Sequence, residues 1–235
     1  MSATWIAVPP EALRGEGLEP YPPGDIGGLF DWAENPQAGS THLMPHAGEI
    51  LLDIVDIEAN AVHQPCKPDD EIVFVAAGTL RLTSDLDQSQ LAVPAGEAVF
   101  IPRGWAGIYR ADPADGRFIE VAVVPHDYFD PTLPRERSAA TPTLVALPQE
   151  AGRHARSYGS YRLVVDDVEE QAATVCATDT LIRVLSGSLT LRDGDRRETL
   201  EAGRLAVLPK GFSGTLAGAP RARLLELSRP GAPAP

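Results

Sequence analysis

Cysteine is scarce in this chain: two of its 235 residues, Cys66 and Cys176, exclude a disulfide framework. No uncharged apolar run approaches the roughly 20 residues that a membrane-spanning helix needs. The sequence begins MSATW, without the basic region and apolar stretch of a signal peptide. These absences predict a cytoplasmic protein that does not interact with membranes.

Basic residues are also few. The chain has 20 Lys and Arg against 33 Asp and Glu, which gives a net charge of −13. Such a surface repels nucleic-acid phosphates and anionic lipids. We therefore expect no nucleic-acid partner and no membrane partner. A small-molecule ligand remains the expected partner, with a homodimer as an open option.

Glycine (21) and proline (22) are plentiful and separate short apolar runs along the whole chain. This pattern is typical of an all-β protein with many turns. A single helical turn is expected near 10–14. The strands that we expect lie at 50–57, 71–75, 79–83, 98–101, 118–124, 162–165, 180–185, 188–192, 205–208 and 223–227.

An internal repeat is the strongest signal in the sequence. EIVFVAAGTLRL, which begins at Glu71, matches TLIRVLSGSLTL, which begins at Thr180. AG…IPRGWAG in the first half matches AG…LPKGFSG in the second, and FIEV matches LLEL. The turn glycines Gly78 and Gly187 are 109 residues apart. The repeat therefore predicts two similar barrels in tandem.

The repeat also predicts the domain boundaries. We expect an N-terminal extension at 1–48 that packs on the barrels, a first barrel at 49–125 and a second at 161–228. A proline-rich linker, with the strand that leads into the second barrel, should fill 126–160. The tail at 229–235 should be disordered.

The repeated blocks resemble the cupin superfamily, and their pairing resembles a bicupin, a protein of two double-stranded β-helix (jelly-roll) barrels. Glu71-x6-Gly78 fits the end of the first cupin motif, Gly-x5-His-x-His-x3–4-Glu-x6-Gly. Gly96-x5-Pro102-x-Gly104 fits the start of the second motif, Gly-x5-Pro-x-Gly-x2-His-x3-Asn. The PRGWAG and PKGFSG turns are similar to those of the ureidoglycine aminohydrolase and ethanolamine-utilisation cupins.

The resemblance implies a divalent metal held by three His and one Glu, and here the sequence departs from the pattern. If four residues separate the second His slot from Glu71, then Gln64 and Cys66 occupy the two His slots, and Gly107 occupies the slot of the third. In the second half, the glutamate slot holds Thr180, so no metal is expected there. Binding of one transition metal in the first barrel would need an imidazole from outside the motif. His63 is the nearest in sequence, and His42 or His46 could come from the preceding segment.

Several residues are therefore candidates for a site in the first barrel. Glu71 is a candidate metal ligand or general base, and otherwise an ordinary residue at a strand edge. Cys66 is a candidate metal ligand or thiolate, and otherwise a small core residue. Tyr109 could offer its hydroxyl to a substrate or simply fill the barrel. The candidates are, as catalytic residues, Glu71, Cys66 and Tyr109; as ligand-binding residues, Gln64 and Trp105; and as metal ligands, Glu71, His63 and Cys66.

Two functions stay open. The first is an enzyme that acts on a small polar metabolite in the first barrel, as a metal-assisted hydrolase or isomerase. The alternative is a non-catalytic bicupin with degenerate metal sites, which binds a small molecule or serves as an assembly or regulatory subunit. The retained Glu71 favours the first function, and the missing histidines favour the second.

Overall fold

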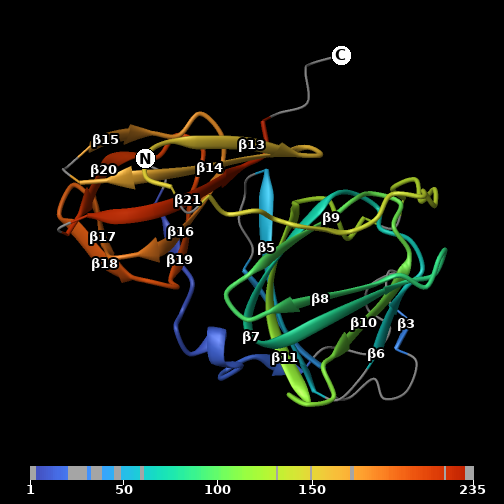
Figure 1. Ribbon diagram of the computed structural model, residues 1–235. Coiled ribbons are helices and arrows are strands. Elements are labelled where there is room, and N and C mark those ends of the chain that lie inside the picture. Colours follow the sequence, from blue (N-terminus) through green and yellow to red (C-terminus); the bar gives the residue numbers. More distant parts are fainter. Residues whose placement is uncertain are drawn as a thin grey trace. The chain divides into compact units, whose positions relative to one another are not determined.

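The computed structural model describes residues 4–20, 31–32, 39–44, 49–58, 61–130, 132–148, 150–169, 172–219 and 221–230. Every expected strand is found, and the expected helical turn is the 3-10 turn Ala12–Arg14. The chain divides into two compact units (Figure 1). We call Pro9–Val145 the first barrel, and Met1–Val8 together with Ala146–Pro235 the second barrel. The first eight residues thus group with the second barrel, and the linker region divides at residue 145; of the tail, 231–235 lie outside the described residues.

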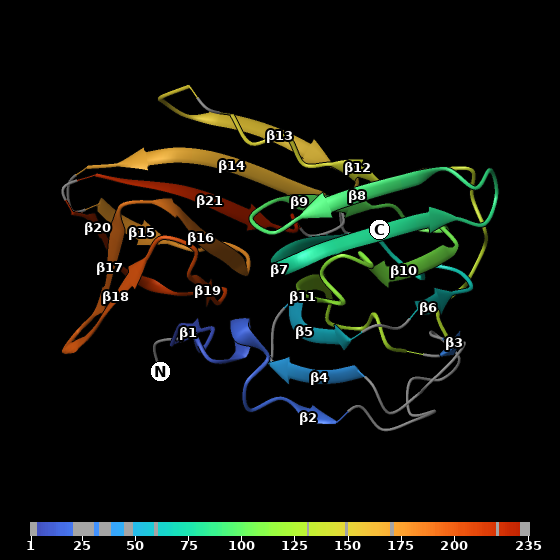
Figure 2. The same cartoon turned by 60° about the horizontal axis from the view of Figure 1, so that its bottom comes forward.

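The first barrel is built from two sheets that share one long strand, β7 (Glu71–Ser84). Its other strands are β2 (Glu19–Pro20), β3 (Asp31–Trp32), β4 (Gly39–Met44), β5 (Ile50–Glu58), β6 (Ala61–Gln64), β8 (Gln90–Pro94), β9 (Ala98–Ile101), β10 (Gly107–Ala111), β11 (Arg117–Pro125) and β12 (Thr143–Leu144). Before Gly78, β7 pairs with β9 and β11; after it, β7 pairs with β8 and β10 (Figure 2). The sequence predicted two strands here. The chain instead continues through Gly78 as one strand and changes sheet there, at a single residue whose φ of +67° lies in the left-handed region.

The second barrel repeats these pairings. Its strands are β1 (Ile6–Ala7), β13 (His154–Tyr158), β14 (Tyr161–Val168), β15 (Ala172–Val175), β16 (Thr180–Ser186), β17 (Ser188–Asp193), β18 (Arg196–Glu201), β19 (Leu205–Leu208), β20 (Ser213–Gly218) and β21 (Ala222–Ser228). β21 lies between β14 and β16, as β11 lies between β5 and β7, and β17 lies between β18 and β20, as β7 lies between β8 and β10. Gly187 corresponds to Gly78. An added Cβ would strike the Arg221 carbonyl at Gly187 and the Arg117 carbonyl at Gly78. The two glycines therefore occupy corresponding places in the strand pairings of the two barrels.

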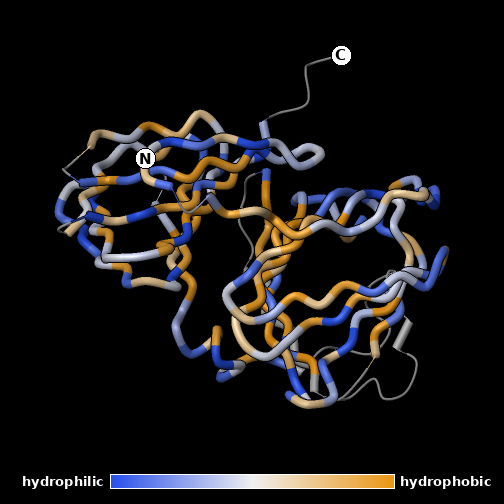
Figure 3. Tube along the Cα trace, viewed as in Figure 1, coloured by the Kyte–Doolittle hydropathy of each residue, from blue (hydrophilic) through white to orange (hydrophobic). Residues whose placement is uncertain are grey.

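Each barrel buries its own core, because alternate residues of a strand face opposite sides of a sheet. Apolar stretches follow the strands, and hydrophilic residues gather in the turns (Figure 3). The core of the first barrel includes Val73, Val75, Leu80, Leu82 and Phe118. Polar residues that share this inward face are therefore exceptions, and they define the candidate site.

Candidate functional site

The paired strands β6 and β10 decide which predicted residues face the interior of the first barrel. Gln64 pairs with Gly107, and Val62 pairs with Tyr109; these four positions face inward. His63 faces the other side, where its Nε2 lies 2.9 Å from Asp85 Oδ2. The structure thus brings Gln64 and Tyr109 to the interior and leaves His63 outside it.

A buried ion pair lies in this interior. The Nζ of Lys67 pairs with Oε2 of Glu71, and the two residues are only 1% and 3% exposed. The Tyr109 hydroxyl donates a hydrogen bond of 3.2 Å to the same carboxylate oxygen. The ammonium also lies over the rings of Tyr109 and Tyr128, 4.8 and 5.4 Å from their centroids. The ion pair, the hydroxyl and the aromatic faces offset the cost of removing the charges from water.

The backbone of Lys67 is fixed by the turn that ends β9. Its N–H donates to the Trp105 carbonyl at 2.8 Å, and its own carbonyl accepts from Gly104 N–H at 2.9 Å. Gly104 adopts a φ of +81°, which glycine tolerates without a steric penalty. The Pro102-x-Gly104 turn, identified in the sequence, therefore places the lysine as well as the tryptophan.

Two further carboxyl groups face the same interior from neighbouring strands. Asp53 on β5 is paired with Ala122 on β11, and Glu120 lies two residues before Ala122 on the same face. Both are buried, and neither Asp53 Oδ1 nor Glu120 Oε2 has a hydrogen-bond partner among the described atoms. Buried polar atoms normally have partners, so these two are unusual.

Burial decides the protonation of these groups. Burial and the nearby charge of Glu71 raise the pKa of Asp53 to about 8, although Lys67 opposes the shift. Burial and the charge of Glu71 also raise the pKa of Glu120 well above its ordinary value. The same two causes raise the pKa of the Tyr109 hydroxyl. At neutral pH, the ion pair is therefore surrounded by neutral groups that can donate hydrogen bonds.

Trp105 closes the interior on one side. Its ring contacts Tyr109 edge-to-face, with centroids 5.4 Å apart, and its buried Nε1 has no partner among the described atoms. A Cβ at Gly107 would overlap this ring. The indole thus fills the space next to the position where the cupin motif has its third histidine.

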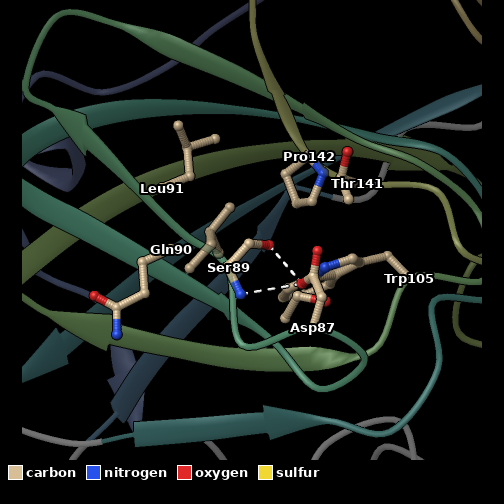
Figure 4. A pocket seen from close by; sticks show the side chains of 9 residues that line it. Asp87, Ser89, Gln90, Leu91, Trp105, Thr141 and Pro142 are labelled. Atoms are coloured by element: carbon tan, nitrogen blue, oxygen red, sulfur yellow. Dashed lines mark hydrogen bonds between the residues drawn. The ribbon is translucent and has the colours of Figure 1, made fainter.

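A pocket of about 320 Å³ lies beside Trp105. Figure 4 shows Leu91 and the Trp105 ring on opposite sides of it, with Pro142 and Asp87 on two others. Trp105 forms one wall of the pocket. Its ring contacts the ring of Tyr109, and the Tyr109 hydroxyl donates a hydrogen bond to Glu71. The pocket therefore lies next to the buried polar groups and is separated from them by the indole.

The remaining predicted residues lie as follows. Cys66 is buried, and its Sγ lies 3.8 Å from the Lys67 carbonyl oxygen; burial raises the pKa of the thiol, which disfavours the thiolate. Gln64 donates to the Cys66 carbonyl at 3.1 Å, and its Oε1 has no partner among the described atoms. The side chain of His42 and all of His46 lie outside the described residues.

The sequence pattern did not point to Lys67, Asp53 or Glu120. A signal for Lys67 was available in the second barrel: Cys176 makes the same two backbone bonds, to Phe212 and from Gly211, that Lys67 makes to Trp105 and from Gly104. Cys176 stands four residues before Thr180, as Lys67 stands four residues before Glu71. Lys67 and Cys176 therefore hold equivalent backbone positions in the two barrels.

The donor side chains described in the first barrel do not fit a divalent metal. Among the described residues, no group of three or more His, Cys, Asp or Glu side chains is close enough to share an ion. Glu71 is already paired with an ammonium, and a catalytic metal usually has about three protein ligands.

The core of the second barrel is mainly apolar, although Glu226, at the position of Glu120, is half-buried opposite Ile182 and burial raises its pKa. Ile182, Leu191, Leu208 and Phe212 belong to its core, together with Trp5 from the start of the chain. Thr180, at the position of Glu71, donates a hydrogen bond of 3.2 Å to the Thr178 carbonyl and also bonds to the Cys176 thiol. Asymmetry between the barrels, which the sequence predicted from Thr180, is visible in these side chains.

Comparison with solved structures identifies the fold. E. coli Ylba has a TM-score of 0.64 and 9% identity, covering 100% of this chain and 94% of its own. A cupin 2 conserved barrel domain protein from Leptotrichia buccalis has a TM-score of 0.61 and 11% identity, covering 85% and 91%. A mutant of Bacillus subtilis oxalate decarboxylase has a TM-score of 0.55 and 12% identity, covering 100% and 79%. The chain has the jelly-roll fold of the cupins.

Sequence comparisons add no assignment, since neither a family model nor a curated protein matches the chain. Within the described residues, no helix has the length and hydropathy needed to cross a membrane.

Proposed function

We propose that the first barrel binds a small polar molecule through its carbonyl or carboxylate oxygens and transfers a proton to or from it without a metal. The observation that carries this proposal is the buried Lys67–Glu71 pair, flanked by two carboxyl groups with partnerless oxygens. Enclosed groups of this kind cost stability and occur most often where they have a chemical role. The reactions that fit are hydrolysis and isomerisation by general acid–base catalysis.

The donors favour an acceptor-rich ligand. An ammonium, two neutral carboxylic acids and a phenol can all donate hydrogen bonds at neutral pH. A ligand amine would instead meet the positive charge of Lys67. Of the two branches suggested by the turns around Trp105 and Phe212, this supports ureido carboxylates over amino alcohols such as ethanolamine.

The pocket beside Trp105 supplies the route in this proposal. Leu82, Leu91 and Pro142 provide apolar wall, while Asp87 and Ser89 provide a polar edge. The ligand would lodge there first and reach Tyr109 and Glu71 when the indole moves aside. The partnerless Nε1–H of Trp105 then becomes available to a ligand oxygen.

A thermal-shift panel of small carboxylates, ureido compounds and amines tests the proposal. We expect ureido or carboxylate compounds to stabilise the wild type and to lose this effect in Glu71→Gln and Lys67→Met. Thr180→Val, at the matching position of the second barrel, is the control and should bind normally. Stabilisation by amines alone, or binding unaffected by either first-barrel variant, would exclude this site.

The alternative function is a non-catalytic binding or assembly module. The filled interior of the second barrel supports a scaffold role for that half of the chain. A compound that binds the first barrel and is recovered chemically unchanged after prolonged incubation would favour this alternative.

A further inference from the structure

The burial of Lys67 inside the first barrel calls for a physical explanation. The Lys67 side chain is 1% exposed, and transfer of an ammonium ion from water to a protein interior costs several kcal/mol. A methionine or leucine would fill the same space without that penalty. What the lysine adds is a fixed positive charge, and this charge lies against Glu71.

The position of this charge is specific. Lys67 holds the backbone position that Cys176 holds in the second barrel, four residues before the inward residue at the start of the next long strand. With three residues before the glutamate, a spacing that the first cupin motif allows, that position carries a metal-binding histidine, and Glu71 holds the position of the metal-binding glutamate. The slot of the third histidine is Gly107, where the Trp105 ring takes up the space. The chain thus places its own cation beside the one metal-ligand position that it retains.

We propose that the Lys67 ammonium is the resident cation of this site: it takes the electrostatic place of a divalent metal, pairs with the buried Glu71 carboxylate, and anchors an oxygen of the ligand. The ligand-anchoring part rests on the function proposed above. The role as resident cation does not, and it can be tested without a ligand.

The test involves the titratable groups described around Lys67. Glu71 and Tyr109 contact the ammonium, Tyr128 lies over it, and Asp53 and Glu120 are near enough for its charge to lower their pKa values. Replacement of Lys67 by Met leaves Glu71 buried without its counter-ion. The carboxyl group must then fold in its neutral form, which costs little at low pH and more as the pH rises.

Urea denaturation at pH 5 and pH 8 measures this effect. We expect Lys67→Met to lower the denaturation midpoint markedly at pH 8 and much less at pH 5. The double variant Lys67→Met/Glu71→Gln, which removes both charges, should recover most of the loss at pH 8. Lys210→Met, the other lysine of the chain and exposed in the second barrel, should leave the midpoint unchanged at both pH values.

Two results would overturn the resident-cation role. One is a Lys67→Met loss that is equal at both pH values and is not recovered in the double variant. The other is one equivalent of Zn²⁺, Mn²⁺, Fe²⁺ or Ni²⁺ in the purified wild type, by elemental analysis, that is lost in Glu71→Gln. We expect less than a tenth of an equivalent in both.

The ligand panel separates this inference from the proposed function. If no compound binds but the pH-dependent loss and its recovery are found, the resident cation stands and the proposed function fails. If a compound binds equally well to the wild type and to the double variant, the anchoring role of Lys67 fails.

Discussion

The indole ring of Trp105 fills the space that any side chain at Gly107 would need. The same relationship joins Phe212 to Gly214 in the second barrel. In both turns an aromatic side chain folds back over a glycine two residues later. The cost of adding a side chain at the glycine should therefore depend on the aromatic residue that precedes it.

Gly107→Ala should lower the free energy of unfolding by about 1–3 kcal/mol, because the new methyl group overlaps the indole and the Thr83 carbonyl. Part of the cost should vanish when Trp105→Ala is already present, since one of the two overlaps is then removed. A double-mutant cycle by urea denaturation measures the coupling. Strictly additive losses would show that the ring and the glycine do not interact.

Asp53→Asn should raise stability, and more so at pH 8 than at pH 4. The pKa of Asp53 is about 8 in the folded protein and about 3.9 in the unfolded chain. Because the folded value is the higher one, stability is full below pH 4 and declines as the pH rises towards 8. Asparagine does not titrate, so the variant should gain a few kcal/mol over wild type between these limits.

Asp56→Asn is the matched control for Asp53→Asn, three residues further along β5. Its carboxylate accepts a 2.8 Å hydrogen bond from Arg117 Nε, so its replacement should lower stability at pH 8. Chemical denaturation across the pH range distinguishes the two variants by sign. A loss of stability at pH 8 in both would contradict the neutral state of Asp53.

Trp5→Ala should destabilise the second barrel by about 3–5 kcal/mol, as expected for loss of a buried tryptophan. Trp5 is 1% exposed, packs edge-to-face on Phe212 and donates from Nε1 to Glu198 at 2.9 Å. Arg196 also lies 4.0 Å from its ring centroid. Hydrogen exchange should show the loss of protection in 161–228 and not in the first barrel. Equal loss in both would contradict the division of the chain.

Gly187→Ala should be far more damaging than Gly194→Ala. Both glycines have positive φ, +74° and +58°, so alanine costs about 1 kcal/mol at either position from backbone strain alone. Only at Gly187 does the added Cβ also strike a backbone carbonyl, that of Arg221. Thermal unfolding of the two variants provides the comparison, and similar losses would show that backbone strain alone decides the cost.

Much of the fold could be predicted because glycine or proline lies beside many of the strands and the pattern occurs twice. Alternation also placed Gln64 and Tyr109 correctly on the inward face, since both follow the register of β6 and β10. The continuous path of β7 through Gly78 could not be predicted. A glycine with positive φ marks a hairpin turn and a change of sheet equally well.

The centre of the site was harder to predict, because its residues look like surface residues in the sequence. Lysine is rarely buried, so Lys67 between two prolines resembles part of an exposed loop. Asp53 and Asp56 both interrupt the apolar run of β5. Only the pairing of β5 with β11 shows that Asp53 lies opposite Ala122, inside the barrel. The pairing of strands in the folded protein, and not the local sequence pattern, therefore determines which of these side chains faces the interior.

The pairing of β1 with β19 has a consequence for the order in which the protein can form. Ile6 pairs with Val207, some two hundred residues later, whereas the first barrel needs nothing beyond Val145. During synthesis the first barrel can fold while the segment that precedes it still lacks its partner strand. Completion of the second barrel must then recapture Trp5, which makes this late step the one most exposed to error and to competition from a second copy of the chain.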